Sequence, residues 1–245
     1  MPRYKLTLEY DGQGFVGWQR QTNGPSIQTA LEDAVYSFVG EKINIYGAGR
    51  TDAGVHAKGQ VCHFDLTKDY TPEVVRNAVN SHLRPAAISI LSVETIDSNF
   101  DSRRHATSRT YLYKIINRRS PLALDHGRAW WCPIPLNNEN MSDAASLLLG
   151  HHDFSTFRAA KCQANSPLRT LDALVIERFD DEIQITGKAQ SFLHKQMRAI
   201  VGTLKLVGEG NWTPNDVSKA LEAKDRKKGG PNAPPHGLYL INVDY

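Results

Sequence analysis

Polar and apolar residues alternate at the start of the chain. In Arg3–Tyr10 the apolar or aromatic side chains occupy every second position, which is the period of a β-strand with one buried face. Similar patterns predict further strands in the first half, at residues 43–45 leading toward residue 52, at residues 60–64 and at residues 87–96. These segments supply the strands of a sheet.

Between these strands, apolar residues recur with the spacing of an α-helix, next to residue types that begin or end helices. Ser26 can cap a helix whose apolar face continues to Phe38, and Gly40 can end it. Thr71 followed by Pro72 is typical of a second helix start, since proline is favoured at the first helical position. The first half thus has the order strand–helix–strand–strand–helix–strand, which is that of a ferredoxin-like unit.

The second half repeats much of this order. Its expected elements are strands at residues 108–117, 169–177, 182–189 and 238–243, and helices at residues 141–149 (ended by Gly150), at residues 192–207 and after Thr213-Pro214. Residues 120–135 and 229–237 are expected to be non-helical. We predict an α+β chain with two ferredoxin-like halves, residues 1–105 and 106–245. They would merge into an extended, mostly antiparallel sheet with helices on one face.

Composition and charge narrow the class of protein only slightly. The chain has 245 residues, 40% of them hydrophobic, and 29 Lys and Arg against 26 Asp and Glu, for a net charge of +3. Basic residues cluster at positions 103–105, 118–119 and 224–228, and such clusters form either solvated faces or phosphate-binding surfaces. Three widely spaced cysteines favour a reducing compartment. With no signal-peptide pattern or long apolar run, we expect a cytoplasmic protein without membrane contact.

The most informative segment is residues 49–56, with the sequence GRTDAGVH. Gly49 and Gly54 allow a tight turn and close approach to a ligand. Arg50 can bind phosphate or carboxylate through its planar guanidinium. Asp52 lies between them, as a carboxylate placed to act on a bound molecule. A plain surface turn would use the same residue types, but rarely in so particular an arrangement.

Common nucleotide and metal motifs do not fit this segment. Val55-His56 follows Gly54 where a P-loop requires Lys and then Ser or Thr, and no GxGxxG pattern is completed. His56, Cys62 and His63 lack zinc-site spacing, and no GxSxG motif is present. We therefore expect chemistry at one carboxylate, without a metal or a nucleotide cofactor.

The chain resembles the tRNA pseudouridine synthase A family over nearly its whole length. Residues 49–56 are similar to the catalytic motif of the family. The other similar segments are YDG with FxGWQ at residues 10–19, RTYxY at 109–113, FSxF at 154–157, RT at 169–170, FLHKQMRxIVG at 192–202 and PxGLYL at 235–240. Gln196-Met197 departs from the Met-Val expected before Arg198, which puts only local packing in question.

The resemblance implies an isomerase with the pseudouridine synthase fold. Its members convert uridine to pseudouridine in the anticodon stem-loop, at tRNA positions 38, 39 and 40. Asp52 would be the nucleophile after the base leaves the helix stack. Attack at the ribose, attack at the base and proton removal from the sugar all remain open.

The resemblance also implies roles for four substrate-binding residues. Arg50 would fill the vacated space or hold a flanking phosphate, and Tyr111 would stack on the target base. Arg198 would pair with Asp52, and Leu193 would line an apolar floor. The implied partners are the tRNA anticodon arm and a second copy of the chain, in a homodimer.

Two alternative functions are also consistent with the sequence. The chain could be a non-catalytic tRNA- or RNA-binding module, which uses its basic clusters and aromatic stacking. A nucleotide-dependent enzyme is the third hypothesis, and the missing P-loop lysine weighs against it.

Overall fold

The structure, a computed structural model, describes residues 1–160 and 162–245. It divides into two compact units. One comprises Met1–Thr107 together with Tyr239–Tyr245, and the other comprises Ser108–Leu238. The last strand therefore lies almost entirely in the unit of the first half, whereas the sequence-based division assigned it to the second.

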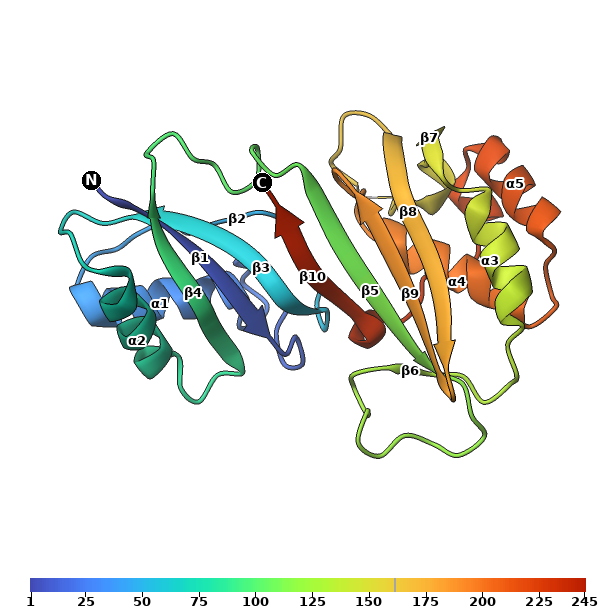
Figure 1. The fold of residues 1–245 in the computed structure, drawn as a ribbon, viewed down its shortest axis with the longest axis horizontal. Helices are drawn as coiled ribbons and strands as arrows, with labels where there is room; N and C mark the ends of the chain where they lie inside the picture. The colour runs from blue at the N-terminus through green and yellow to red at the C-terminus, as the bar shows by residue number, and fades with distance from the viewer. Residues whose placement is uncertain (161) are drawn as a thin grey trace. The chain divides into compact units, whose positions relative to one another are not determined.

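The N-terminal unit is a small mixed sheet with two helices (Figure 1). Its elements are β1 (Arg3–Tyr10), α1 (Ile27–Val39), β2 (Tyr46–Gly47), β3 (His56–Asp65), α2 (Pro72–Leu83), β4 (Ile88–Ile96) and β10 (Leu238–Asp244). Strand β1 is antiparallel to both β3 and β4, and β2 is antiparallel to β3. Strand β10 is parallel to β3, with Tyr239 opposite His56.

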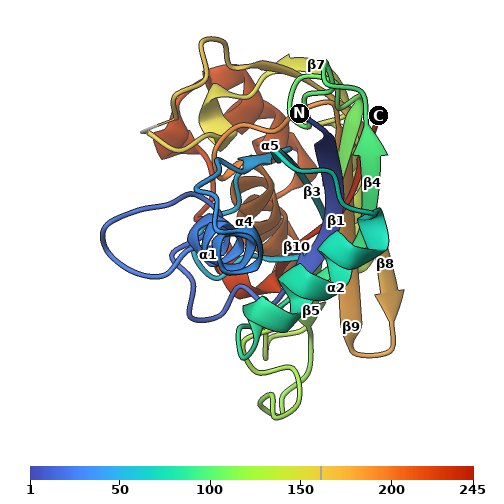
Figure 2. The ribbon, with the colours of Figure 1, turned by 90° about the vertical axis from the view of Figure 1, so that its left-hand side faces the viewer.

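The expected alternation forms the core of this unit. Tyr4, Leu6, Leu8 and Tyr10 of β1 are all buried, so one face of the strand is removed from water. Figure 2 shows α1 beside one face of β1 and β3. Both helices begin as predicted, because the side chains of Ser26 and Thr71 accept hydrogen bonds from the first turns of α1 and α2.

The C-terminal unit is an antiparallel sheet with three packed helices. Its elements are β5 (Ser108–Ile116), β6 (Trp130–Trp131), α3 (Asn138–Ser146), β7 (Gly150–Asp153), β8 (Leu168–Phe179), β9 (Glu182–Ala189), α4 (Gln196–Gly208) and α5 (Pro214–Ala223), with single 3₁₀ turns at Ser155–Phe157, Arg226–Lys228 and Pro235–Gly237. The strand order β5-β9-β8-β7 is antiparallel throughout, and β6 is parallel to β5. Gly187 of β9 lies directly beneath Met197 of α4.

The α+β class and the order of the main elements are confirmed, and three boundaries were wrong. The strand expected at residues 43–45 is only Tyr46–Gly47, because α1 side chains bind Ile45 instead: its amide donates to Glu32 Oε1, and its carbonyl accepts from Gln28 Nε2. The helix expected to end at Gly150 ends at Ser146, and Gly150, with φ of 93°, begins strand β7.

The third boundary lies at α4, which begins at Gln196 rather than at residue 192. Lys195 precedes the helix with a left-handed φ of 63°, and the Leu193 amide donates to Gln196 Oε1 at 2.8 Å. Residues 192–195 are therefore a turn that leads into the helix.

Candidate active site

Asp52 lies in a tight turn between β2 and β3. The Val55 amide donates to the Asp52 carbonyl at 3.1 Å, and Gly54 has φ of 75° at the third position of the turn. Only residues that tolerate positive φ suit that position, which explains the glycine. Asp52 is half-buried, whereas Arg50 is exposed. The turn thus holds an acid and a base two residues apart, both of them reachable from solvent.

The approach to this turn is tied to the strand that leaves it. The Ala48 amide donates to the Val61 carbonyl at 2.7 Å, and Gln60 Nε2 donates to the Gly49 carbonyl at 2.9 Å. Gln60 is fully buried. A buried side-chain hydrogen bond of this kind fixes the loop with little freedom to move.

Residues 10–19, which form the first motif of the resemblance, pack against the Asp52 turn. Gly17 forms an isolated bridge with Asp52, and the Trp18 amide donates to the Thr51 carbonyl at 3.1 Å. Gly17 has φ of 111°, and a Cβ there would lie 2.5 Å from the Thr51 carbonyl oxygen. This glycine is required by both conformation and space.

Helix α1 supports the same segment from its other side. The Ile27 amide donates to the Gly17 carbonyl at 3.2 Å, and the Gln28 amide donates to the Trp18 carbonyl at 3.0 Å. These are amides of the first helical turn, which have no partner within the helix. The Asp52 turn, residues 17–18 and the start of α1 therefore form one continuous hydrogen-bonded layer.

His56 connects the segment of residues 49–56 to three other groups. Its Nδ1 lies 3.0 Å from the Gly12 amide nitrogen and 3.1 Å from Asp11 Oδ1, and its ring stacks on Tyr239 at 4.7 Å. In the neutral ring Nδ1 accepts from Gly12, and a proton on Nδ1 would be donated to Asp11. Sequence analysis compared His56 with a P-loop residue and with a zinc ligand and rejected both. Its place inside the eight-residue motif was the available signal for a structural role.

Tyr111 contacts the residue that precedes Leu193 in the C-terminal unit. Tyr111, in β5, is 8% exposed, and its ring meets that of Phe192 edge-on at 5.1 Å. Leu193 follows directly and is buried. The turn that precedes α4 therefore places Phe192 against Tyr111 and buries Leu193.

Arg198 is held by the segment that precedes β10. Its Nε donates to the Ala233 carbonyl at 2.8 Å, and the Ala233 amide donates back to the Arg198 carbonyl at 2.9 Å. The guanidinium of a half-buried arginine is thereby oriented by backbone that lies 35 residues away in sequence. Sequence analysis expected residues 229–237 to be non-helical and did not connect them with Arg198; the 3₁₀ turn at Pro235–Gly237 departs from that expectation.

That segment, residues 229–237, packs closely on α4 and β5. A Cβ on Gly202 would lie 1.8 Å from the Pro231 carbonyl oxygen, and the Tyr113 hydroxyl donates to the Pro234 carbonyl at 2.8 Å. Burial raises the pKa of Tyr113, although the nearby charge of Arg198 acts in the opposite direction. The phenol therefore remains a protonated donor, and Arg198 lies close to β5.

The structure thus groups the predicted site residues within the two units. Arg50 and Asp52 lie two residues apart in the N-terminal unit. Tyr111, Leu193 and Arg198 belong to the C-terminal unit, where Tyr111 contacts Phe192 and Arg198 binds the Ala233 carbonyl. Within residues 1–160 and 162–245, no three His, Cys, Asp or Glu side chains are grouped to hold a metal ion. Across the same residues, no helix has the length and apolar character needed to cross a bilayer.

Comparison with known proteins identifies the family. The sequence model described as tRNA pseudouridine synthase matches residues 7–103 and 144–245, which is more than half of the chain. The chain belongs to the tRNA pseudouridine synthase family. The matched ranges contain the Asp52 turn, Leu193 and Arg198, and Tyr111 lies between them.

Individual members of the family are similar over the full length of the chain. A tRNA pseudouridine synthase A of Sinorhizobium fredii is 59% identical, with all of both chains covered. Proteins of the same name from Paramagnetospirillum magneticum and Parvibaculum lavamentivorans are 56% and 54% identical, with all of this chain covered and 96% and 100% of the relatives.

Proposed function

We propose that this chain is a tRNA-modifying isomerase that converts uridine to pseudouridine. One observation carries the proposal: the GRTDAGVH segment, in a chain of this family, forms a hydrogen-bonded turn that presents Asp52 beside Arg50. The relatives are named for this activity on tRNA. The proposed targets are uridines of the anticodon stem-loop.

The reaction is an internal rearrangement, so its atoms balance without a second substrate. The bond between ribose C1′ and base N1 breaks, the base turns, and a bond forms between C1′ and C5. C5 then loses its proton, and N1 gains one. Asp52 would act covalently or as a base in the first step, as carboxylates do at oxocarbenium-like centres.

The remaining residues would bind and orient the extruded nucleotide. Tyr111 would contact the base, and Leu193 would exclude water from the intermediate. Arg198 would pair with the Asp52 carboxylate and keep it ionised. The order of the motifs in the sequence supports these roles, and the fixed orientation of Arg198 through Ala233 suits a residue that must meet a carboxylate in one geometry.

Arg50 is suited to bind incoming RNA, because its side chain is exposed. It would replace the flipped base in the helix stack or hold the adjacent phosphate. Flipping costs a few kcal/mol, which such contacts offset in part. We also propose that the chain acts as a homodimer in the cytoplasm, where its substrate is found.

Purified protein and unmodified tRNA test the proposal directly. Carbodiimide treatment followed by primer extension maps pseudouridine, and we expect new stops confined to the anticodon arm. Tight binding without any new stop would contradict the proposal and favour an RNA-binding module. Size-exclusion chromatography with light scattering at assay concentrations checks the dimer, and a monomeric mass would contradict that part.

A further inference from the structure

A pocket with three basic residues in its lining lies in the C-terminal unit, away from the Asp52 motif in sequence. It has a volume of about 280 Å³ and is lined by Ser155, Arg158, Ala159, Ala160, Lys224, Asp225 and Arg226. Three of these side chains are cationic and one is acidic. Sequence analysis noted the basic run at residues 224–228 without assigning it a function.

The walls of this pocket are held in place by hydrogen bonds, one of them buried. Thr156 is fully buried, and its Oγ1 donates to the Ala220 carbonyl of α5 at 2.6 Å. The Arg226 guanidinium donates to the Gly230 carbonyl at 2.8 Å and to Asn232 Oδ1 at 3.2 Å. A ligand would therefore meet a formed site rather than order a loose one.

A neighbouring carboxyl group responds to the positive field of the pocket. Burial disfavours the ionised form of Asp153, yet its pKa is lowered. The opposing causes are hydrogen bonds from Ser155, whose amide lies 2.9 Å from Asp153 Oδ1, and the charges of Lys224 and Arg158. The two cations thus act at the same place, where they favour negative charge.

The pocket adjoins the turn that carries predicted substrate-binding residues. The Ala159 amide, in the pocket wall, donates at 2.9 Å to the carbonyl of His194, which directly follows Leu193. Lys227 and Lys228 are exposed beside the pocket and extend its positive surface. A polyanion bound near Leu193 would pass close to these groups.

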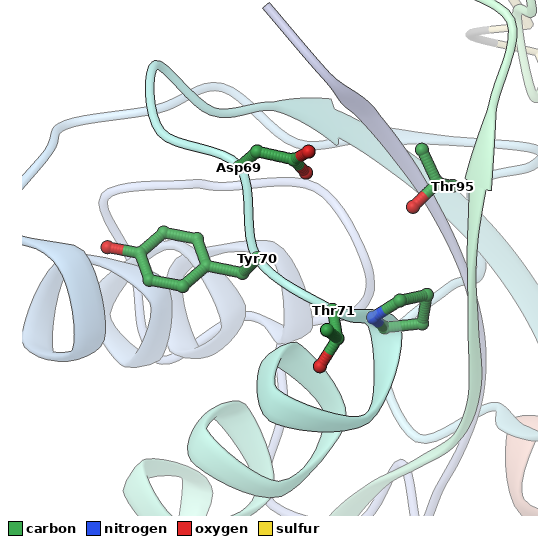
Figure 3. Close-up of a pocket in the computed structure, with 5 residues that line it drawn as sticks. Asp69, Tyr70, Thr71 and Thr95 are labelled. Carbon is green, nitrogen blue, oxygen red and sulfur yellow. The ribbon is translucent and has the colours of Figure 1, made fainter.

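A second pocket, in the N-terminal unit, differs from the first in the charge of its lining. It has a volume of about 360 Å³ and is lined by Asp69, Tyr70, Thr71, Pro72 and Thr95, around the start of α2 (Figure 3). Its only charged lining residue is an acid, and Thr71 already caps the helix. Its lining offers no cationic side chain to an anion.

We propose that the pocket formed by Arg158, Lys224 and Arg226 binds a backbone phosphate of the RNA substrate. The inference rests on the proposed function, because the RNA is the substrate of that reaction. Arginine and lysine together supply a planar fork and a mobile point charge, the usual partners of phosphate oxygens. This site would hold the strand while the target nucleotide occupies the catalytic site.

The test compares two double variants that remove the same charge. Arg158→Gln with Lys224→Gln alters the pocket, and Arg226 is kept because it holds the wall. The control, Arg76→Gln with Lys219→Gln, removes one arginine and one lysine from the outer faces of α2 and α5. Fluorescence anisotropy gives the Kd for a labelled, unmodified anticodon arm at several salt concentrations, and circular dichroism checks folding.

We expect the pocket variant to raise Kd about tenfold and to reduce the magnitude of the salt slope by about one, as for loss of a phosphate contact. The control should differ from the wild type by less than half as much. Arg158→Lys with Lys224→Arg should restore most of the affinity. Equal effects of the two charge-removing variants would overturn the proposal, because general attraction would then explain both.

Inorganic phosphate, at constant ionic strength, separates a small-anion site from an RNA site. If phosphate raises the melting temperature of the wild type but not of the pocket variant, and RNA affinity is unchanged, the RNA assignment is overturned. Pseudouridine formation by the wild type is measured in parallel. A wild type that binds RNA at this pocket but makes no product would contradict the proposed function alone.

Discussion

The phenolic oxygen of Tyr10 and Thr51 Oγ1 lie 2.8 Å apart, in a buried hydrogen bond that joins the end of β1 to the residue before Asp52. Tyr10→Phe removes this bond and leaves the Thr51 hydroxyl without that partner. We expect a loss of about 1–2 kcal/mol in the free energy of unfolding. The rate of pseudouridine formation at saturating tRNA should fall about tenfold, because small displacements of a catalytic group are costly.

Urea unfolding and single-turnover assays measure these two effects. Tyr36→Phe is the matched control, since Tyr36 is 49% exposed on α1. It should leave both quantities close to those of the wild type. A Tyr10→Phe enzyme with the wild-type rate would show that this bond does not help to position the turn.

Gly17 and Gly14 both have positive φ, but only Gly17 is crowded. A Cβ at Gly17 would lie 2.5 Å from the Thr51 carbonyl oxygen, whereas a Cβ at Gly14 would meet nothing within 4 Å. Gly14→Ala should cost about 1–2 kcal/mol from backbone strain. Gly17→Ala should cost roughly 1–3 kcal/mol more, because the Asp52 turn must move.

Comparing the two variants separates the cost of the close contact at Gly17 from the cost of a positive φ, which both positions share. Urea midpoints give the stability difference, and the same samples are assayed for pseudouridine. We expect Gly14→Ala to retain most of the activity and Gly17→Ala to lose it. Equal stability of the two variants would contradict the close packing of residues 17–18 against the turn.

His63 makes part of the stability dependent on pH. Its pKa lies below the usual 6.5, because burial disfavours the charged ring and the charge of Arg3 adds to this. Nδ1 accepts a hydrogen bond from the Ser102 amide at 3.2 Å, which requires that nitrogen to be unprotonated. The unfolded chain therefore binds the proton more tightly than the folded one.

This contribution to stability is complete above about pH 6.5 and is lost as the pH falls toward the lowered pKa of the folded state. Free energies of unfolding measured between pH 5 and 8 should rise with pH more steeply in the wild type than in His63→Phe. His126→Phe, at an exposed position, should keep the wild-type slope. Parallel curves for the wild type and His63→Phe would contradict the assignment.

Arg198 tests whether orientation matters as well as charge. Arg198→Lys keeps the charge but loses the hydrogen bond from Nε to the Ala233 carbonyl. We expect the single-turnover rate to fall about 100-fold in Arg198→Ala and to recover only in part in Arg198→Lys. Full activity of the lysine variant would show that a point charge is sufficient. A double-mutant cycle with Asp52→Asn, measured as the free energy of unfolding, would give the coupling between the two groups.

Most of the fold could be predicted because its signals are local. Alternation in β1 and the caps at Ser26 and Thr71 require only neighbouring residues, and all three are confirmed. One error arose where side chains distant in sequence replaced backbone partners. Glu32 and Gln28 of α1 bind Ile45 in place of a neighbouring strand. The local sequence around residues 43–45 gives no sign of these two hydrogen bonds.

The candidate site divides in the same way. The motif that contains Asp52 was evident from the amino-acid sequence. The residues that contact the motif and orient Arg198 come from other parts of the chain. Tyr239 stacks on His56, and Ala233 orients Arg198, across sequence separations that periodicity does not span. Gln196, noted as a departure from the expected motif, forms the bond to Leu193 that begins α4 late.

The most direct test of the central claim is single-turnover pseudouridine formation by Asp52→Asn, with tRNA affinity measured on the same preparation. Asp180→Asn, in the exposed turn between β8 and β9, is the control, because asparagine also tolerates the positive φ at that position. We predict that Asp52→Asn makes no detectable product and binds tRNA within a few-fold of the wild type. Product formation by Asp52→Asn at a rate near that of the control would contradict the account.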